Sequence, residues 1–194
     1  MWEVVRFWLD LGVDGFRLDA IGTIFEDPSW ADHHLDFNLD DLYIENRKAS
    51  SPEERQRVAR RWDLLFAGQH DLPEMHSLMR DLRVLVDQYP GRVLIGETDE
   101  IAFYGNGRNE LHLVFNFPLM RTDRITADHV LENQRQRLAA LPAGAWPCNT
   151  LGNHDSPRML SQFGDGVHDR EIARLNLFIL LTLQGTPVLY NGEE

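Results

Sequence analysis

The sequence predicts an α/β fold in which helices cover a parallel β-sheet. Short, unbroken apolar runs recur along the chain, as expected for strands that are buried on both faces. Segments with apolar residues at helical spacing separate these runs, so that strand and helix alternate. The chain has 194 residues and neither an internal repeat nor a linker-like stretch, which favours one sizeable core over two domains.

Local signals mark where several of these elements begin and end. Ser51 is a suitable N-cap, Pro52 suits the first helical position, and Glu54 stands three residues after the cap. Gly12 and Gly185 are suited to end the helices before them. We expect helices over residues 2–10, 51–66, 73–88, 127–141 and 170–183, and strands over residues 15–18, 93–95, 113–117, 148–151 and 187–190. Residues 21–50 are rich in Asp, Asn and His and are expected to form a long loop.

Composition excludes several classes of function. A formal net charge of -12 argues against nucleic-acid binding, which needs clustered Lys and Arg, and it suits a neutral substrate handled by carboxylates. No apolar run is long enough to span a membrane, and Met1 does not open a signal peptide. The single cysteine, Cys148, excludes an internal disulfide and is typical of a reducing compartment, so we expect a cytoplasmic protein.

Carboxylates follow three of the expected strands. Asp19 follows the first strand, Glu97 the second and Asp155 the fourth. Five strand–helix units could form an open doubly wound sheet or part of a (β/α)8 barrel, and in a barrel the C-terminal ends of all strands open on one face. We therefore expect the three carboxylates to converge. A single carboxylate at a strand end is often only the N-cap of the next helix, but three are poorly explained in that way.

Converging carboxylates without a Cys/His cluster suggest a divalent cation held by oxygens, or the cleavage of glycosidic bonds. The chain has no Gly-rich or basic phosphate-binding loop, which weakens the first alternative. Arg17 points to the same face as Asp19 and can keep that carboxylate ionised. Glu97 has no cation beside it in sequence, and a nearby carboxylate favours the protonated form that a general acid needs. The His-rich stretch 32–36 is expected to be solvated or to line substrate, so no metal site is predicted.

The motifs around these carboxylates resemble those of the alpha-amylase family of glycoside hydrolases. Gly15-Phe16-Arg17-Leu18-Asp19 is similar to the family's G-x-R-x-D region, Ile95-Gly96-Glu97 to its acid-bearing strand end, and Asn153-His154-Asp155 to its N-H-D region. The three occur in the family's order, and the resemblance covers essentially the whole chain. Asn153 to Arg158 reads N-H-D-S-P-R, as in the alpha-glucosidase and oligo-1,6-glucosidase subgroup.

This resemblance implies a role for each residue of the site. Asp19 would be the nucleophile, Glu97 the general acid and base, and Asp155 the stabiliser of the distorted sugar. Substrate-binding residues would be Arg17, His154, Asn153, Arg158 and Ala20, of which Ala20, directly after the nucleophile, favours alpha-1,4 linkages. The reaction would retain the anomeric configuration, with the carboxyl groups of Asp19 and Glu97 about 5–5.5 Å apart. The implied partner is a small oligosaccharide substrate, with no cofactor, nucleic acid or membrane; the resemblance implies nothing about the oligomeric state.

The resemblance also implies a partial barrel. The five strands would be the fourth to the eighth of a (β/α)8 TIM barrel, so residues 1–194 would be one partial catalytic domain, truncated at both ends. Because such a fragment leaves two open sheet edges, we expect the isolated chain to be weakly stable and weakly active or inactive. Two alternatives remain: a glucosyl-transferring enzyme such as a trehalose synthase or transglucosidase, and a non-catalytic, partner-binding relative. Relatives of the second kind usually lose one or more carboxylates, whereas all three are present here.

Overall fold

The computed structural model describes residues 1–30, 32, 34–70 and 72–194. Of the His-rich stretch, His33 lies outside these described residues. The chain divides into two compact units, one formed by Met1–Ile21 and His76–Glu194 and the other by Gly22–Met75. All five strands of the described chain lie in the first unit, as do the three carboxylates that follow strands.

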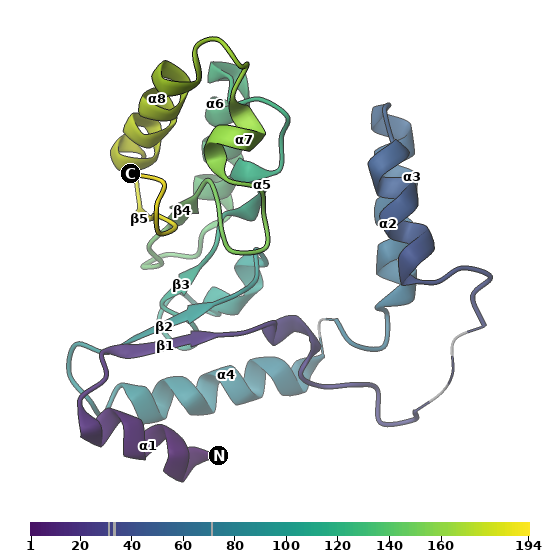
Figure 1. Ribbon diagram of the computed structural model, residues 1–194. Coiled ribbons are helices and arrows are strands. Elements are labelled where there is room, and N and C mark those ends of the chain that lie inside the picture. The colour runs from purple at the N-terminus through teal and green to yellow at the C-terminus, as the bar shows by residue number, and fades with distance from the viewer. Residues whose placement is uncertain (31, 33, 71) are drawn as a thin grey trace. The chain divides into compact units, whose positions relative to one another are not determined.

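The strands form two parallel arrangements (Figure 1). β1 (Gly15–Leu18), β2 (Val93–Gly96) and β3 (Leu113–Val114) make a three-stranded sheet in that order, and β4 (Cys148–Thr150) pairs with β5 (Thr186–Val188). Every pairing is parallel, which confirms the α/β class and the parallel strands predicted from the apolar runs. In β1 and β2, Leu18 stands opposite Gly96. The residues that follow, Asp19 and Glu97, therefore leave the sheet at the same level.

No backbone ladder joins β3 to β4 in the described chain, and buried polar side chains connect these two strands instead. The hydroxyl of Tyr104 accepts a hydrogen bond from the backbone N–H of Val114 at 3.1 Å and donates one to the carbonyl of Trp146 at 2.9 Å. Asn116, just after β3, donates from its side-chain amide to the side-chain oxygen of Asn149 in β4 at 2.9 Å. The two sheets are thus held side by side by hydrogen bonds from side chains.

Arg137 adds a buried cation to this junction. Its guanidinium donates to the backbone carbonyls of Asp99, Val114 and Phe115 at 2.7, 3.0 and 2.8 Å. Burial lowers the pKa of Arg137, because the surrounding protein solvates the charged form less well than water does. Three carbonyl dipoles nevertheless offset much of that cost, since hydrogen bonds to a charged group are the stronger kind.

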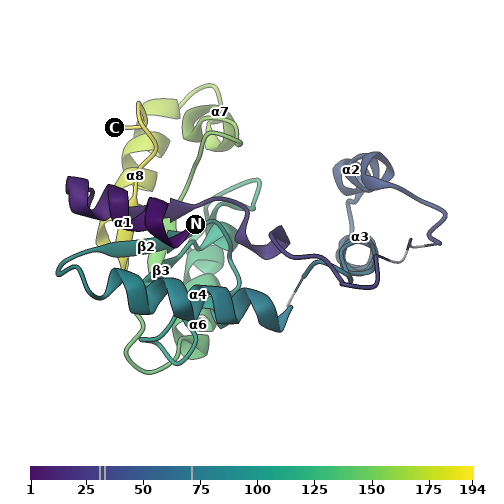
Figure 2. The same ribbon diagram turned by 90° about the horizontal axis from the view of Figure 1, so that it is seen from below.

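Helical segments precede β1 and separate the strands of the first unit. They are α1 (Trp2–Leu11), α4 (Pro73–Val86, whose first turn belongs to the second unit), α5 (Phe117–Met120), α6 (Ala127–Ala140), α7 (Met159–Phe163) and α8 (Asp169–Thr182), with short 3-10 turns η1 (Ile21–Thr23) and η2 (Ile101–Tyr104). Gly12 ends α1 in the left-handed conformation predicted for it, with φ of 104°. Figure 2, seen from below, shows α1 and α4 as separate helices next to the β1–β2 part of the sheet. One core cluster joins α5, α7 and α8 to β4 through Leu119, Leu151, Met159, Phe163 and Leu180.

Two expectations from the sequence are corrected by the structure. Residues 21–50 are not all loop, because α2 (Leu39–Lys48) forms there. Asn38 and Asp41 cap its start reciprocally, and this capping box lies among many other polar residues. The strand expected over residues 113–117 ends at Val114, and α5 begins at Phe117. Pro118 has no N–H to give to a ladder and suits the first turn of a helix.

The second unit consists mainly of α2 and α3 (Pro52–Leu65). Ser51 caps α3 as predicted: its hydroxyl accepts from the N–H of Glu54, and the Glu54 carboxylate accepts from the N–H of Ser51. Arg61 of α3 forms an ion pair with Glu45 of α2 at 2.6 Å. In the part of the chain that is described, none of the helices combines the length and the apolar character needed to cross a membrane.

Candidate active site

The ends of β1 and β2 bring a cation between two carboxylates. Arg17 forms an ion pair with Asp19 through one terminal nitrogen of its guanidinium. Its other terminal nitrogen lies 2.7 Å from Oε1 of Glu97. The planar guanidinium presents its N–H groups in a fixed fork, so one arginine can orient both carboxylates at once.

The cation between them sets the charge state of Asp19. Hydrogen bonding to Arg17, then to the Glu97 side chain, and the positive charge of Arg17 hold the pKa of Asp19 below its ordinary value. Asp19 is 77% exposed, whereas Glu97 is only 18% exposed. Arg17 thus lies beside Asp19, where the strand pattern places it, and its charge favours the ionised form of that carboxylate. The assumption that Glu97 lacks a neighbouring cation is wrong in three dimensions, because the parallel register of β1 and β2 places Arg17 beside it.

Ala20 contributes through its backbone. It adopts a left-handed conformation with φ of 42°, which is uncommon for a residue other than glycine. Its N–H donates to Oε2 of Glu97 at 3.0 Å, so the two oxygens of that carboxylate are engaged by Ala20 and by Arg17. Sequence reasoning considered only the size of the Ala20 side chain and missed this contact, because it depends on the turn that follows β1.

The loop after β4 carries the third carboxylate. The side-chain oxygen of Asn153 accepts a hydrogen bond from the N–H of Asp155 at 3.0 Å, which closes a tight turn. Nε2 of His154 lies 3.4 Å from Oδ2 of Asp155. Glu97, His154 and Asp155 each offer one possible ligand atom, and these atoms lie within 4.8 Å of one another. The structure therefore brings all three carboxylates close together. Glu97 shares Arg17 with Asp19 on one side and lies near Asp155 on the other.

A pocket of about 160 Å³ opens at this place. Arg17, Glu97, Asn153 and His154 line it together with residues that the sequence did not single out as site residues: Phe115, Phe117, Thr150, Gly152, Val188, Leu189 and Tyr190. The rings of Phe115 and Phe117 are stacked, with centroids 5.1 Å apart. The apolar residues of this lining end β5 or follow β3 and β5. The rule that strand ends share one face therefore also applies to strands without a terminal carboxylate, and it is the signal that points to these residues.

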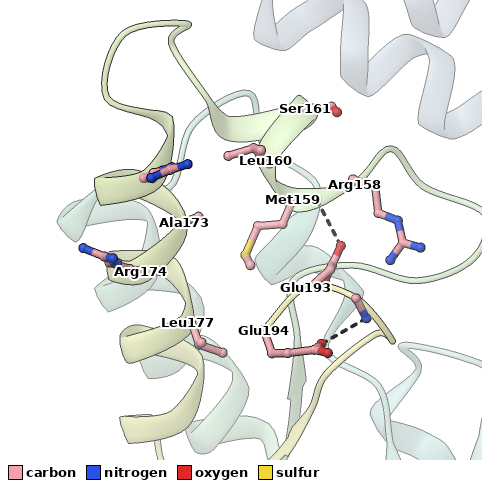
Figure 3. Close-up of a pocket in the computed structure, with 11 residues that line it drawn as sticks. Arg158, Met159, Leu160, Ser161, Ala173, Arg174, Leu177, Glu193 and Glu194 are labelled. Atoms are coloured by element: carbon pink, nitrogen blue, oxygen red, sulfur yellow. Dashed lines mark hydrogen bonds between the residues drawn. The ribbon is translucent and has the colours of Figure 1, made fainter.

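Arg158 lies apart from this pocket. It lines a larger cavity of about 620 Å³ between α7, α8 and Gly192–Glu194, shown in Figure 3. Its guanidinium donates to the carbonyl of Asn191 and lies 4.4 Å from the centre of the Tyr190 ring. Tyr190 lines the smaller pocket, whereas Arg158 does not. Arg158 therefore borders that pocket only indirectly, by packing against the Tyr190 ring.

The arrangement suits acid–base and nucleophilic chemistry on a neutral polyol. It offers an exposed, ionised carboxylate, a less exposed carboxylate beside it, and a third carboxylate paired with an imidazole. Glu97, His154 and Asp155 are also close enough to hold a divalent cation, although one of the three is already engaged by Arg17.

Comparison with known proteins agrees with this interpretation of the motifs. A probable alpha-glucosidase of Rhizobium meliloti is 33% identical over 199 residues, which cover 98% of this chain and 34% of that protein. The human amino acid transporter heavy chain SLC3A1 is 30% identical over 208 residues, covering 99% of this chain and 27% of its own. The crystal structure of the alpha-glucosyl transfer enzyme XgtA superposes with a TM-score of 0.75 at 29% identity, covering 99% of this chain and 35% of that one.

The chain thus spans between 27% and 35% of the length of these relatives. Its structural neighbours are alpha-amylase-family barrels, and the parallel strands with covering helices are consistent with part of such a barrel. The family description "Alpha amylase, catalytic domain" matches residues 1–194, and the chain belongs to the alpha-amylase family.

Proposed function

We propose that this chain supplies the catalytic carboxylates of a retaining alpha-glucosidase that releases terminal alpha-linked glucose from short oligosaccharides. The observation that carries the proposal is the shared cation: Arg17 contacts both Asp19 and Glu97, while Asp155 and His154 approach Glu97 from the β4 side. In this proposal the chain forms the fourth to eighth strands of the barrel.

The proposed reaction has two steps. In the first, Asp19 forms a bond to the anomeric carbon while the glycosidic bond breaks and Glu97 gives its proton to the leaving oxygen. In the second, Glu97 takes a proton from water, the water oxygen attacks the anomeric carbon, and the bond to Asp19 breaks. Arg17 suits Asp19 to the nucleophilic role because it favours the ionised form.

The remaining residues would hold the sugar. His154 and Asp155 are exposed side chains that can hydrogen-bond the hydroxyl groups of one glucosyl unit. Asn153 shapes their loop, Arg158 supports Tyr190 at the pocket wall, and the small Ala20 leaves room that favours an alpha-1,4 linkage. A cytoplasmic location stays a prediction that rests on the single cysteine.

Hydrolysis of 4-nitrophenyl alpha-glucoside tests the proposal, both for the 194-residue chain and for a protein that also carries the other three strands of the proposed barrel, here called the full-length protein. We expect the full-length protein to release alpha-glucose first, as seen by ¹H NMR of the anomeric proton, and the Asp19→Asn variant to lose turnover while keeping its fold. First release of beta-glucose, or full activity of Asp19→Asn, would contradict it.

Glucosyl transfer is the second candidate, because the structural neighbour XgtA is named an alpha-glucosyl transfer enzyme. The two activities share their carboxylates and differ in the acceptor. Incubation with maltose alone separates them: a hydrolase yields glucose only, whereas a transferring enzyme accumulates trehalose or longer sugars. A non-catalytic role, as a relative named a transporter heavy chain would suggest, is disfavoured by the presence of all three carboxylates.

A further inference from the structure

We propose that Glu193 is a positioning residue that fixes the loop carrying Asn153, His154 and Asp155. The inference rests on the proposed function only in assigning a catalytic use to that loop. It concerns a residue outside the carboxylate pocket, in the lining of the larger cavity that Arg158 and Met159 also line.

Glu193 holds the C-terminal end of the loop. Its Oε1 accepts a hydrogen bond from the backbone N–H of Met159, the first residue of α7, at 3.0 Å (Figure 3). That N–H has no partner within the helix, so the carboxylate satisfies a donor that the helix itself leaves unpaired. The residue just before it, Arg158, is held by the same segment, since its guanidinium bonds the carbonyl of Asn191.

Glu193 also lies against the N-terminal end of the loop. A Cβ placed on Gly152 would come within 2.7 Å of Oε1 and 2.8 Å of Oε2 of Glu193. The carboxylate therefore occupies the space that any other residue at position 152 would need for its side chain. Gly152 is buried, and the Glu193 carboxylate, the end of a flexible side chain, would have to move to admit a Cβ there.

The segment from Tyr190 to Glu193 is itself a hydrogen-bonded turn. The N–H of Glu193 donates to the carbonyl of Tyr190 at 3.2 Å, and the Tyr190 ring packs under the guanidinium of Arg158. One end of the loop is thus bonded to this turn and the other end lies against it, and the loop between them brings His154 and Asp155 close to Glu97. A change in the position of the Glu193 carboxylate would shift both residues together.

The neighbouring residue provides a matched control. Glu194 also uses its carboxylate to accept a backbone N–H, that of Gly192 at 3.0 Å, and Figure 3 shows both bonds. Its bond stays within the terminal turn and does not reach the loop. Glu193→Ala and Glu194→Ala therefore remove the same chemical group from adjacent positions, and only the first releases the loop.

The first experiment measures the histidine ring signals in ¹H–¹³C NMR spectra of the 194-residue chain, with His154 assigned by substitution. We expect the His154 signal to move or broaden in Glu193→Ala, to return in Glu193→Gln, which keeps one acceptor oxygen, and to stay unchanged in Glu194→Ala. Equal spectra for Glu193→Ala and Glu194→Ala would overturn the inference. This readout needs no activity, so it separates a failure of the inference from a failure of the proposed function.

A second experiment uses the close approach of Gly152 and Glu193. Gly152→Ala should displace the Glu193 carboxylate and move the His154 signal, but it should add little in a Glu193→Ala background, where the space is free. In the active full-length protein, Glu193→Ala and Gly152→Ala should each lower kcat by roughly 10- to 100-fold, the cost of a small misplacement of reacting groups, while Glu193→Gln restores most of it. Additive effects of the two substitutions, or no rescue by Gln, would contradict a positioning role.

Discussion

Replacing Gly15 by Ala should separate β1 from β2 at the start of the strand that carries Arg17 and Asp19. Gly15 has φ of 150°, a region that residues with a side chain rarely adopt. A Cβ there would stand 1.9 Å from the carbonyl oxygen of Val93 and 2.8 Å from its backbone nitrogen and carbonyl carbon. Because backbone atoms of the partner strand cannot turn aside, the strands themselves would have to move apart by about 1.5 Å to reach an ordinary contact of 3.4 Å.

The expected cost can be divided into two parts. The unfavourable backbone conformation costs about 1–3 kcal/mol. Opening the strand pair weakens the hydrogen bond from the N–H of Val93 to the carbonyl of Asp14, now 3.0 Å long, and its neighbour in the ladder, at about 1 kcal/mol each. The free energy of unfolding should therefore fall by about 3–5 kcal/mol, a large share of the stability of a typical domain.

Gly12→Ala is the matched control for this substitution. Gly12 also has a positive φ, 104°, but a Cβ there would meet no atom within 4 Å. Only the conformational part then applies, and the loss should be about 1–2 kcal/mol. Urea unfolding followed by far-UV circular dichroism measures both variants. If Gly15→Ala proves as stable as Gly12→Ala, the close approach of β1 and β2 does not exist as described.

Three further predictions concern charged and buried groups. Arg17→Met should raise the pKa of Asp19 toward its ordinary value, which ¹³C NMR titration of the carboxyl carbon measures; an unchanged pKa would contradict the pairing. Burial raises the pKa of Cys148 to about 11, so the folded state loses stability as pH rises from about 9 to 11, where only the unfolded thiol ionises. Between pH 8 and pH 11 this effect should lower the free energy of unfolding, measured with urea, by about 2–3 kcal/mol. Cys148→Ala should remove this part of the loss. Arg137→Met removes the guanidinium that donates to three backbone carbonyls and should lower the free energy of unfolding by about 2–4 kcal/mol, measured the same way; a neutral effect would show that those bonds contribute nothing net.

The strands and most helices could be predicted from the sequence because their signals are local. A buried strand such as 93–95 is a short apolar run, and α3 has a complete start signal in Ser51 to Glu54. The helix α2 was missed because its capping box lies in a stretch dominated by Asp and Asn, whose composition suggests a loop. The junction between β3 and β4 could not be predicted, since it depends on side chains as distant in sequence as Tyr104 and Arg137.

The candidate site was predictable in its residues but not in its contacts. Motif and strand-end position were enough to select Asp19, Glu97 and Asp155. The sharing of Arg17 between two carboxylates depends on the register of β1 against β2, which one strand's sequence does not contain. The contact of Ala20 with Glu97 depends on a left-handed turn, and the role inferred for Glu193 depends on the absence of a side chain at Gly152.

Covalent trapping of the nucleophile tests the central claim most directly. A 5-fluoro-alpha-glucosyl fluoride forms a glycosyl-enzyme that hydrolyses slowly, so the labelled residue can be located by peptide mass spectrometry after incubation with the active full-length protein. The account predicts one sugar per chain, attached to the peptide that contains Asp19, and no label in Asp19→Asn. Labelling of another carboxylate, or turnover without any labelled intermediate, would contradict it.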